Sequence, residues 1–415
     1  MNLKTTLLSC ALLCLFTACG APAQEKQRKN QLFVQEIPVP AREGSVVPNL
    51  FVTEDEQLYM SWIEPENDST HVLRFSKLEN GRWTTPKTIA QGSNWFVNWA
   101  DFPSLAVGTD GTITAHWLVK RTSETYDYDV YVSQSSDQGN TWKQPFILHT
   151  DGVAAEHGFV ALVALPDNSI FATWLDGRNT KNEAQAESHE AHGMGPMSLR
   201  AAKMDTEGKV YDAMEMDEKV CDCCQTDAAL TSGGLVVVYR NRSDNETRDI
   251  YLMREVNGQW TDPAPVHDDG WEIAGCPVNG PAIDAYDQNV AIAWFTGAHE
   301  QPKVQVAFSK DAGASFSPPL HIDHGDPLGR VDVVVLEDAS AWVSWMEGTT
   351  EGAAIMAVHV SEEGTKLTTQ TIASTNPSRA SGFPVMERAG NHLYFAWTQV
   401  DSVSSLRTAY LLLEE

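Results

Sequence analysis

The sequence has few basic residues for its size. Its 415 residues include 29 Lys and Arg against 56 Asp and Glu, which gives a formal net charge of −27. A nucleic-acid-binding protein needs a basic surface that displaces counterions from phosphate, and a protein that docks on anionic lipid needs basic residues as well. The charge balance therefore argues against nucleic acid as a partner and against electrostatic binding to a membrane.

Long hydrophobic runs and nucleotide-binding motifs are also missing beyond the N-terminus. No later stretch reaches the ~18 consecutive apolar residues that a transmembrane helix needs. No Gly-rich loop follows a strand and opens a helix, so nothing indicates a nucleotide site. In the insertion 179–196, His189 and His192 lie three residues apart, whereas the metalloprotease helix places its histidines four apart. We interpret this insertion as a solvated lid. The alternative is that its histidines reach a nearby metal site.

The N-terminus has the features of an export signal. Residues 1–18 contain one cation, Lys4, followed by the apolar run 7–16 and small residues. Residues 15–20, Leu-Phe-Thr-Ala-Cys-Gly, resemble a bacterial lipobox, which implies lipid attachment at Cys19 after cleavage. Residues 19–30 are polar and predict a tether. We expect a bacterial lipoprotein in the periplasm or at the cell surface, held to the membrane by its lipid. Ordinary cleavage near residues 21–23 is the alternative.

The rest of the chain, residues 31–415, is a repeat. A short apolar strand that ends in Trp or Tyr recurs seven times, at Trp62, Trp117, Trp174, Tyr239, Trp294, Trp345 and Trp397. Successive copies lie 51 to 65 residues apart, and the unit 103–149 offers four strand-like segments. This pattern is typical of a β-propeller. We predict one all-β domain of four-stranded blades, with seven blades and with six as the alternative.

The two ends of this domain are complementary. The last unit, 382–415, has only three strands, and the segment 31–39 resembles the missing fourth. We predict that this N-terminal strand completes the last blade, so that no open sheet edge remains.

An octapeptide in the second unit carries a turn signature. Residues 135–142 are Ser-Ser-Asp-Gln-Gly-Asn-Thr-Trp, and residues 309–316 repeat the pattern. In such a turn Asp accepts local backbone N–H groups, Gly allows a positive φ, and the aromatic residue packs between blades. We predict structural roles for Asp137, Gly139, Trp142, Asp311, Gly313 and Phe316.

This octapeptide matches the Asp-box, or BNR repeat, of the sialidase superfamily, and the chain resembles its bacterial sialidase-like lipoproteins. The resemblance implies a glycoside hydrolase of the exo-sialidase type, which binds a substrate carboxylate through three Arg and uses a Tyr nucleophile, a Glu and an Asp. It assigns catalytic candidates Asp101, Glu156 and Tyr239, with Tyr126 and Tyr128 as other possible nucleophiles. Its substrate-binding candidates are Arg178, Arg240, Arg248, Arg330, Arg379, Trp99 and Trp271. These residues belong to loops that emerge on one face of a propeller. Local salt bridges such as Asp176–Arg178 are the alternative for each Arg.

Four cysteines remain once Cys10, Cys14 and Cys19 are set aside. Cys221, Cys223 and Cys224 lie in the entry loop of the fourth unit, and Cys276 lies in that of the fifth, so we expect them to be neighbours. In an exported protein the default is disulfides, and three pairings are possible. The alternatives are a thiolate site for Cu(I) or Zn, with His157 as a further ligand, and a reducible disulfide with redox activity.

Three functions therefore remain open at the level of sequence. The first is a sialidase-like hydrolase acting on an acidic or neutral glycan. The second is a non-catalytic propeller that binds a glycan, a peptide or another small polar ligand. The third is a metal- or redox-handling lipoprotein centred on the cysteines. In each case we expect a monomer.

Overall fold

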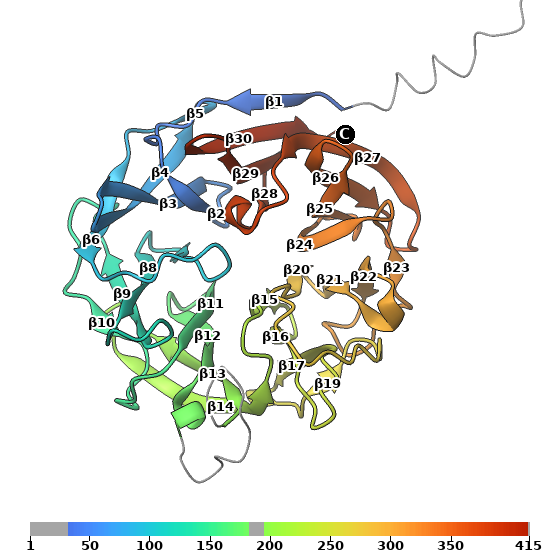
Figure 1. The fold of residues 1–415 in the computed structure, drawn as a ribbon, viewed down its shortest axis with the longest axis horizontal. Coiled ribbons are helices and arrows are strands. Elements are labelled where there is room, and N and C mark those ends of the chain that lie inside the picture. Colours follow the sequence, from blue (N-terminus) through green and yellow to red (C-terminus); the bar gives the residue numbers. More distant parts are fainter. Residues whose placement is uncertain (1–31, 182–194, 414–415) are drawn as a thin grey trace, which may run out of the picture.

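The computed structural model describes residues 32–181 and 195–413. Seven antiparallel sheets surround a central axis as the blades of a propeller (Figure 1). The predicted all-β fold is confirmed, and so is the count of seven blades. The expected signal 1–18, tether 19–30, lipidation site Cys19, and the histidines of the 179–196 insertion lie outside the described residues.

Each blade runs from an inner strand at the axis to an outer strand at the rim. The first contains β2 (Val46–Val52), β3 (Leu58–Asn67), β4 (Thr70–Glu79) and an outer strand in two parts, β5 (Arg82–Trp83) and β6 (Lys87–Ser93). The second contains β7 (Leu105–Val107), β8 (Ile113–Lys120), β9 (Tyr128–Ser135) and β10 (Phe146–Ile147). The third contains β11 (His157–Ala164), β12 (Ile170–Asp176), β13 (Met197–Met204) and β14 (Val210–Val220). The fourth contains β15 (Asp227–Thr231), β16 (Gly234–Arg240), β17 (Ile250–Val256), β18 (Gln259–Trp260) and β19 (Ala264–Pro265).

The remaining blades follow the same order. The fifth contains β20 (Ala282–Tyr286), β21 (Asn289–Thr296), β22 (Lys303–Ser309) and β23 (Leu320–His321). The sixth contains β24 (Pro327–Val335), β25 (Ala341–Thr349), β26 (Gly352–Val360) and β27 (Lys366–Thr375). The seventh contains β28 (Val385–Ala389), β29 (His392–Val400), β30 (Ser404–Leu412) and β1 (Val34–Ile37). Short 3₁₀ helices in the loops are η1 (Arg178–Lys181), η3 (Ala298–Glu300) and η4 (Arg379–Ser381). No helix of the described chain is long and apolar enough to span a bilayer.

The N-terminal strand closes the ring as predicted. β1 pairs antiparallel with β30, with Val34 opposite Leu411 and Ile37 opposite Thr408 (Figure 1). The last blade thus combines both ends of the domain, and its outer edge is covered by a strand from the start of the chain. β1 is therefore the outer strand of this blade, and its pairing with β30 joins the two ends of the domain.

Three of the repeated Trp residues make the same hydrogen bond, to an acidic residue of their own strand. Trp62, Trp174 and Trp345 are buried, and each indole N–H donates to the acidic residue two positions later in its strand. The Trp62–Glu64 and Trp174–Asp176 bonds measure 3.0 and 2.9 Å. Residues i and i+2 of a strand lie on the same face, so the acid sits beside the ring. The acidic residue therefore satisfies a buried donor in these blades.

The two Asp-box turns have the predicted contacts. Asp137 Oδ1 accepts the backbone N–H of Thr141 at 2.9 Å, and Oδ2 accepts the Thr141 hydroxyl at 2.7 Å. Gly139 has φ +76°, and a Cβ there would meet the ring of Phe75, in the next blade, at 2.4 Å. Trp142 packs edge-on against that same ring. In the second copy Asp311 binds Ser315 in the same way, Gly313 has φ +79°, and Phe316 packs on the apolar cluster between β16 and β21.

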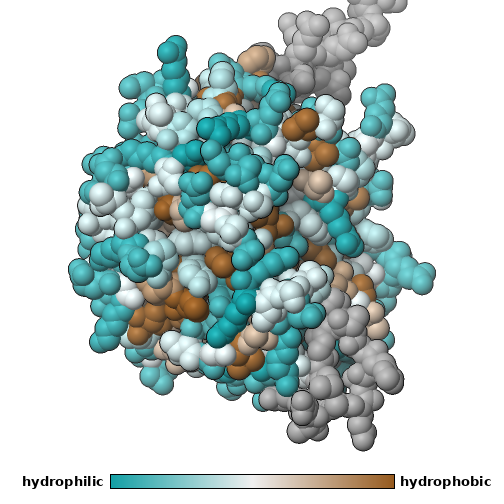
Figure 2. All heavy atoms as spheres, turned by 60° about the vertical axis from the view of Figure 1, so that its left-hand side comes forward, coloured by the Kyte–Doolittle hydropathy of each residue, from teal (hydrophilic) through white to brown (hydrophobic). Residues whose placement is uncertain are grey.

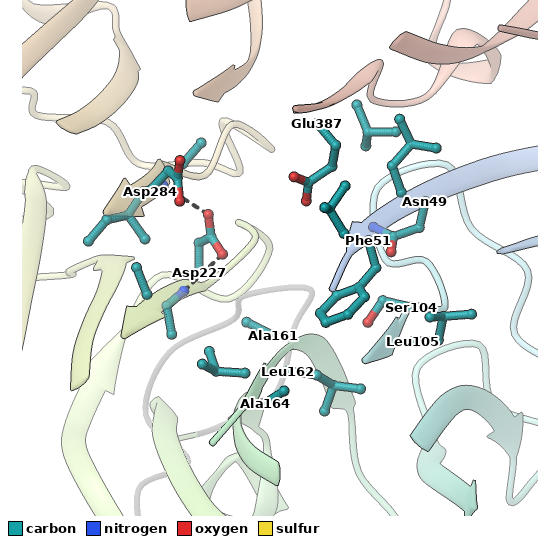
Figure 3. Close-up of a pocket in the computed structure, with 18 of the residues that line it drawn as sticks. Asn49, Phe51, Ser104, Leu105, Ala161, Leu162, Ala164, Asp227, Asp284 and Glu387 are labelled. Atoms are coloured by element: carbon teal, nitrogen blue, oxygen red, sulfur yellow. Dashed lines mark hydrogen bonds between the residues drawn. The ribbon is translucent and has the colours of Figure 1, made fainter. Parts of the chain in front are cut away.

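A central channel of about 1190 Å³ lies between the inner strands. Its lining includes the carboxyl groups of Asp227, Asp284, Asp332 and Glu387, and Figure 3 labels Asp227, Asp284 and Glu387. Three of the four accept a backbone N–H from the next blade: Asp227 from Ile283 at 2.9 Å, Asp284 from Val335 at 2.7 Å and Asp332 from Met386 at 2.6 Å. These carboxyl groups link blades around the axis.

One side chain spans the channel near the face on which the candidate residues gather. The Gln225 amide donates to the carbonyl of Ala100, which precedes β7, and accepts the N–H of Gly280, which precedes β20. It thereby connects the second, fourth and fifth blades. The side of the molecule seen in Figure 2 is mostly hydrophilic, with one larger apolar patch at the lower left of the view and smaller apolar spots elsewhere.

Candidate functional site

Three of the candidate side chains converge between the second and third blades. The Tyr128 hydroxyl lies 2.7 Å from Asp101 Oδ2 and 2.9 Å from Glu156 Oε1. Asp101 and Glu156 come from the loops that precede β7 and β11, and Tyr128 begins β9. Asp101 and Tyr128 are fully buried, whereas Glu156 is half-buried. We call this group the carboxyl–tyrosine site, and Glu156 is the member that solvent reaches.

The local chain is built to hold these groups in place. The Asn98 side chain accepts the N–H groups of Ala100 and Asp101, which fixes the loop that carries Asp101. A Cβ on Gly158 would meet Asp101 Oδ2 at 1.9 Å, so only glycine fits there. The ring of Tyr128 stacks on Phe96 at 4.1 Å. The position of each polar atom is therefore set by packing as well as by hydrogen bonds.

Burial raises the pKa of both carboxyl groups. It raises that of Glu156 to about 8, and the charges of Asp101, Asp222 and Cys276 add to the effect. It raises that of Asp101 to about 7, although the backbone N–H of Phe159, at 2.7 Å, stabilises the charged form. The pKa of Tyr128 lies well above its usual value because of burial and the two carboxyl groups.

The hydrogen-bond pattern then assigns the protons. A phenol has a single O–H, so Tyr128 can donate to only one carboxylate at a time. Asp101 already accepts a backbone N–H and is the better anion, so Tyr128 donates to it. The short contact between Tyr128 and Glu156 is then made by the carboxyl proton of Glu156. At neutral pH the site therefore holds one more proton than isolated carboxyl groups would, on the side chain nearest to solvent.

Tyr239, the nucleophile suggested by the resemblance, lies elsewhere. It is fully buried in an apolar cluster of the third and fourth blades, and its hydroxyl donates to Asp217 at 2.6 Å. A substrate cannot reach it, so that assignment is wrong. Tyr128 occupies the position between two carboxyl groups, but it too is buried and contacts its neighbours rather than solvent.

Four of the five Arg candidates are engaged by internal partners, and three of these belong to the third and fourth blades. Arg178 makes two bonds of 2.7 Å to Asp176, as the salt-bridge alternative expected. Arg240 is buried and donates to the backbone carbonyls of Asn279, Arg248 and Phe295. Arg248 donates to Glu246 at 2.7 Å and to Cys221 Sγ at 3.2 Å.

Arg330 and Arg379 gather around Trp99. Arg330 is buried and donates to the carbonyls of Ser378 and Gly382, and its pKa falls to about 10 because of burial and the neighbouring charge of Arg379. The two guanidinium groups lie 4.9 and 5.8 Å from the Trp99 ring. Arg379 is exposed and Trp99 is half-buried. A clamp of three open Arg side chains is therefore not assembled, and Arg379 with Trp99 remains as a cationic and aromatic patch. Trp271 is buried beneath Arg240.

The four cysteines lie together at the entry loops of the fourth and fifth blades, as expected. Cys221 Sγ lies 3.5 Å from Cys224 Sγ and 4.0 Å from Cys223 Sγ, and Cys276 is a hydrogen-bond partner of Cys223. A disulfide requires an S–S distance near ~2.05 Å, so none of these thiols is bonded to another. The expected disulfide between blades is absent among the described residues. Burial opposes ionisation of Cys221, but hydrogen bonds from Cys223 and Cys224 and the charge of Arg248 hold its pKa well below the usual range.

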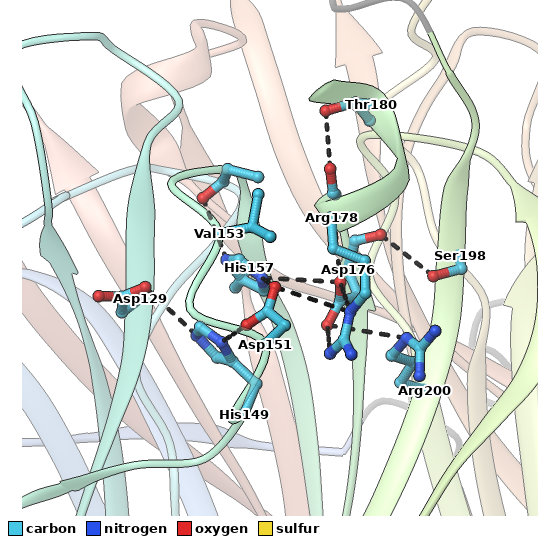
Figure 4. A network of polar contacts seen from close by, with 12 residues as sticks. Asp129, His149, Asp151, Val153, His157, Asp176, Arg178, Thr180, Ser198 and Arg200 are labelled. Atoms are coloured by element: carbon cyan, nitrogen blue, oxygen red, sulfur yellow. Dashed lines mark hydrogen bonds and ion pairs between the residues drawn. The ribbon is translucent and has the colours of Figure 1, made fainter. Parts of the chain in front are cut away.

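His157 does not join the cysteines. Its Nδ1 contacts the carbonyls of Tyr128 and Ala155, and its Nε2 lies 3.1 Å from Asp151 (Figure 4). Its ring stacks on His149 at 3.6 Å. The assignment of His157 as a partner of the cysteines is therefore wrong, because both of its nitrogens already serve a separate charged network. The sequence alone gave no sign of the contact between His157 and Asp151, which lies in the loop after β10.

Comparisons with known proteins identify the architecture. No protein-family model matches the chain, and no curated protein matches it either. Among solved structures it is similar to an ulvan lyase of polysaccharide lyase family PL25, with 10% identity, 93% of this chain and 94% of that chain covered, and a TM-score of 0.55. It is also similar to a protein of unknown function from Dyadobacter fermentans, at 14% identity, 92% and 99% coverage, and a TM-score of 0.51. The NanB sialidase of Streptococcus pneumoniae matches at 8% identity, 92% coverage of both chains and a TM-score of 0.49. The matches with TM-scores above 0.5 support the propeller fold and, at 10% and 14% identity, nothing beyond it.

Proposed function

We propose that the protein is a glycan-cleaving enzyme, a glycoside hydrolase whose proton donor is Glu156. The observation that carries the proposal is the Tyr128 hydroxyl bridging Asp101 and Glu156 at 2.7 and 2.9 Å. Such an arrangement keeps a carboxylic acid protonated near neutral pH at a solvent-reachable position, and acid catalysis of glycoside cleavage requires that state. The solved propeller structures that act on polysaccharides fit the same class of substrate.

The chemistry follows from the order of the three groups. Glu156 gives its proton to the glycosidic oxygen as the C–O bond breaks, and water adds to the anomeric carbon. The carboxylate of Glu156 then takes up the proton that the water releases. Tyr128 and Asp101 are positioning residues, because they are buried and set the proton affinity of Glu156 through hydrogen bonds.

The substrate class follows from the patch around Trp99. A half-buried indole supplies an apolar platform for a sugar ring, and the exposed Arg379 beside it can pair with a carboxylate or sulfate. With the other four Arg candidates engaged internally, we favour an acidic glycan in general over sialic acid in particular. The proposal retains an exported, lipid-anchored monomer that meets its glycan outside the cytoplasm.

The test is a product analysis of the purified protein with acidic and neutral oligosaccharides. We expect new reducing ends with the mass of added water from acidic substrates, and no products from the Glu156→Gln variant. Unsaturated products without added water would show that the site cleaves its glycan by elimination and not by hydrolysis. Binding without any turnover across the panel would contradict the proposal and favour a binding propeller.

A further inference from the structure

Three sets of described side chains are close enough to share a metal ion. They are Cys221, Cys223 and Cys224, the set Asp129, His149 and His157, and the set Asp151, His157 and Asp176. The last two overlap in His157, whose nitrogens already contact Asp151 and two backbone carbonyls. Asp176 is also held by two bonds to Arg178. The side chains of these two sets already bind one another or Arg178, whereas the cysteine set brings together three sulfur atoms, one of which accepts an N–H from Arg248.

The spacing of the sulfur atoms fits a metal better than a disulfide. Zn–S bonds measure ~2.3 Å in tetrahedral sites, which places neighbouring sulfurs about 3.8 Å apart. The observed distances from Cys221 Sγ are 3.5 Å to Cys224 and 4.0 Å to Cys223, on either side of that value. A disulfide would require one pair to approach to ~2.05 Å. The thiols are therefore separated as the ligands of one soft ion would be.

The surroundings of the cluster also suit bound thiolates. Cys221 and Cys224 are buried, Cys223 is half-buried, and Cys276 is exposed at the mouth. Arg248 donates an N–H to Cys221 Sγ at 3.2 Å, the kind of outer contact that orients a metal ligand and offsets its negative charge. The backbone N–H of Cys221 is tied to the carbonyl of Arg240 at 3.0 Å, which fixes the start of the loop.

We propose that Cys221, Cys223 and Cys224 bind one thiophilic metal ion, Zn²⁺ or Cu⁺, and that Cys276 is its fourth ligand. Thiolates select these ions over hard cations such as Mg²⁺. The fourth ligand comes from the next blade, so the ion joins the fourth and fifth blades where a disulfide was expected. This proposal goes beyond the proposed function and does not depend on it, because no ligand belongs to the carboxyl–tyrosine site.

The experiment measures metal content and affinity of the full chain. Protein purified under reducing conditions is analysed by elemental analysis and native mass spectrometry, then stripped and titrated separately with Zn²⁺ and Cu⁺ against a competing chelator. We expect one ion per chain and loss of stoichiometric binding in Cys224→Ser. In Cys276→Ser the ion remains but binds roughly tenfold or more weakly, and in Arg248→Gln about 10- to 100-fold more weakly. Comparison of the affinities measured for Zn²⁺ and Cu⁺ shows which of the two ions the site prefers.

A control separates this site from the histidine network. His149→Gln alters the other candidate set and should leave metal content and affinity unchanged. If Cys224→Ser does not fold, Co²⁺ substitution of the wild type decides, because thiolate ligation gives a sulfur-to-cobalt charge-transfer band that Cys276→Ser shifts. The proposal is overturned if the protein is metal-free with no alkylatable thiols. It is equally overturned if Cys224→Ser keeps stoichiometric binding, if Cys276→Ser binds the ion as tightly as the wild type, or if binding disappears in His149→Gln.

Discussion

Two groups of carboxylic acids in this propeller have a raised pKa, and they differ in what surrounds them. In the channel, burial raises the pKa of Asp227, Asp284 and Asp332 to about 7, 6 and 8. Each of these side chains accepts a backbone N–H from the adjacent blade. In the carboxyl–tyrosine site, Asp101 and Glu156 have similar values but meet on one hydroxyl. A raised pKa alone therefore does not mark a catalytic group.

The geometry of the second group is what distinguishes it. Asp227, Asp284 and Asp332 each accept a backbone N–H from the next blade, as Asp101 also does from Phe159. Asp101 and Glu156 in addition share Tyr128, so a proton on one affects the other, and Glu156 can pass its proton to a bound molecule. We therefore distinguish carboxyl groups that link the blades from carboxyl groups that can perform acid catalysis. Variants in each group test this distinction.

The largest expected effect is that of Glu156→Gln on catalysis. Removing a general acid costs about 10²- to 10⁴-fold in turnover, so we expect a loss of kcat in that range with the fold intact by circular dichroism. Glu387→Gln, which changes a channel carboxyl group in the same way, is the matched control and should retain full activity. Equal losses in both variants would erase the distinction between the two groups.

A smaller effect is expected for Arg379→Gln. A hydrogen bond to a charged group contributes ~1.5–3 kcal/mol, so loss of the exposed guanidinium should raise KM for an acidic oligosaccharide roughly tenfold or more and leave kcat unchanged. Arg178→Gln, which removes a guanidinium already bound to Asp176, should leave KM unaltered. A change of kcat rather than KM in Arg379→Gln would contradict the assignment of this residue to substrate binding.

The smallest effect concerns the pH dependence of stability. The folded pKa of Asp332 is about 8, above the ~3.9 of an unfolded chain. The neutral form therefore stabilises the fold fully below pH ~4, and that contribution is lost as the pH rises toward 8. Urea unfolding should show a more stable wild type at pH 5 than at pH 8. Asp332→Asn should reduce that difference, because the variant has no carboxyl proton to lose between these two pH values. If the difference in unfolding free energy between pH 5 and pH 8 were the same in the variant, ionisation of Asp332 in the channel would not destabilise the fold.

Much of the fold could be predicted because it rests on local and periodic signals. The aromatic-ended strands gave the blade count, and the Asp-boxes gave two turns whose glycines have the positive φ that the motif requires. The closing strand could be predicted from the three-stranded last unit. These features depend on residues close in sequence or on the number of strands in each repeat, and neither depends on how side chains pack.

The site was predicted only in part because it depends on three-dimensional contacts. The sequence predicted that Asp101 and Glu156 share a face, and the structure brings them together, yet the tyrosine between them is Tyr128 and not Tyr239. Both are aromatic residues of central strands, and only the packing shows which hydroxyl meets the carboxyl groups. Gly158, whose missing Cβ makes room for Asp101, carries no signal in a single sequence. Arg178 binds the nearby Asp176, as the sequence suggested, but Arg240 and Arg330 bind backbone carbonyls, which no sequence pattern displays.

The most direct test of the central claim is to measure the protonation state of Glu156. Infrared difference spectra between the wild type and Glu156→Gln, recorded from pH 5 to pH 9, monitor it. The account predicts that the wild type has a carboxylic acid C=O band that the variant lacks, and that this band disappears with a midpoint near the Glu156 pKa of about 8. A wild-type spectrum identical to that of Glu156→Gln at pH 6 would contradict the account, because Glu156 would then hold no proton to donate.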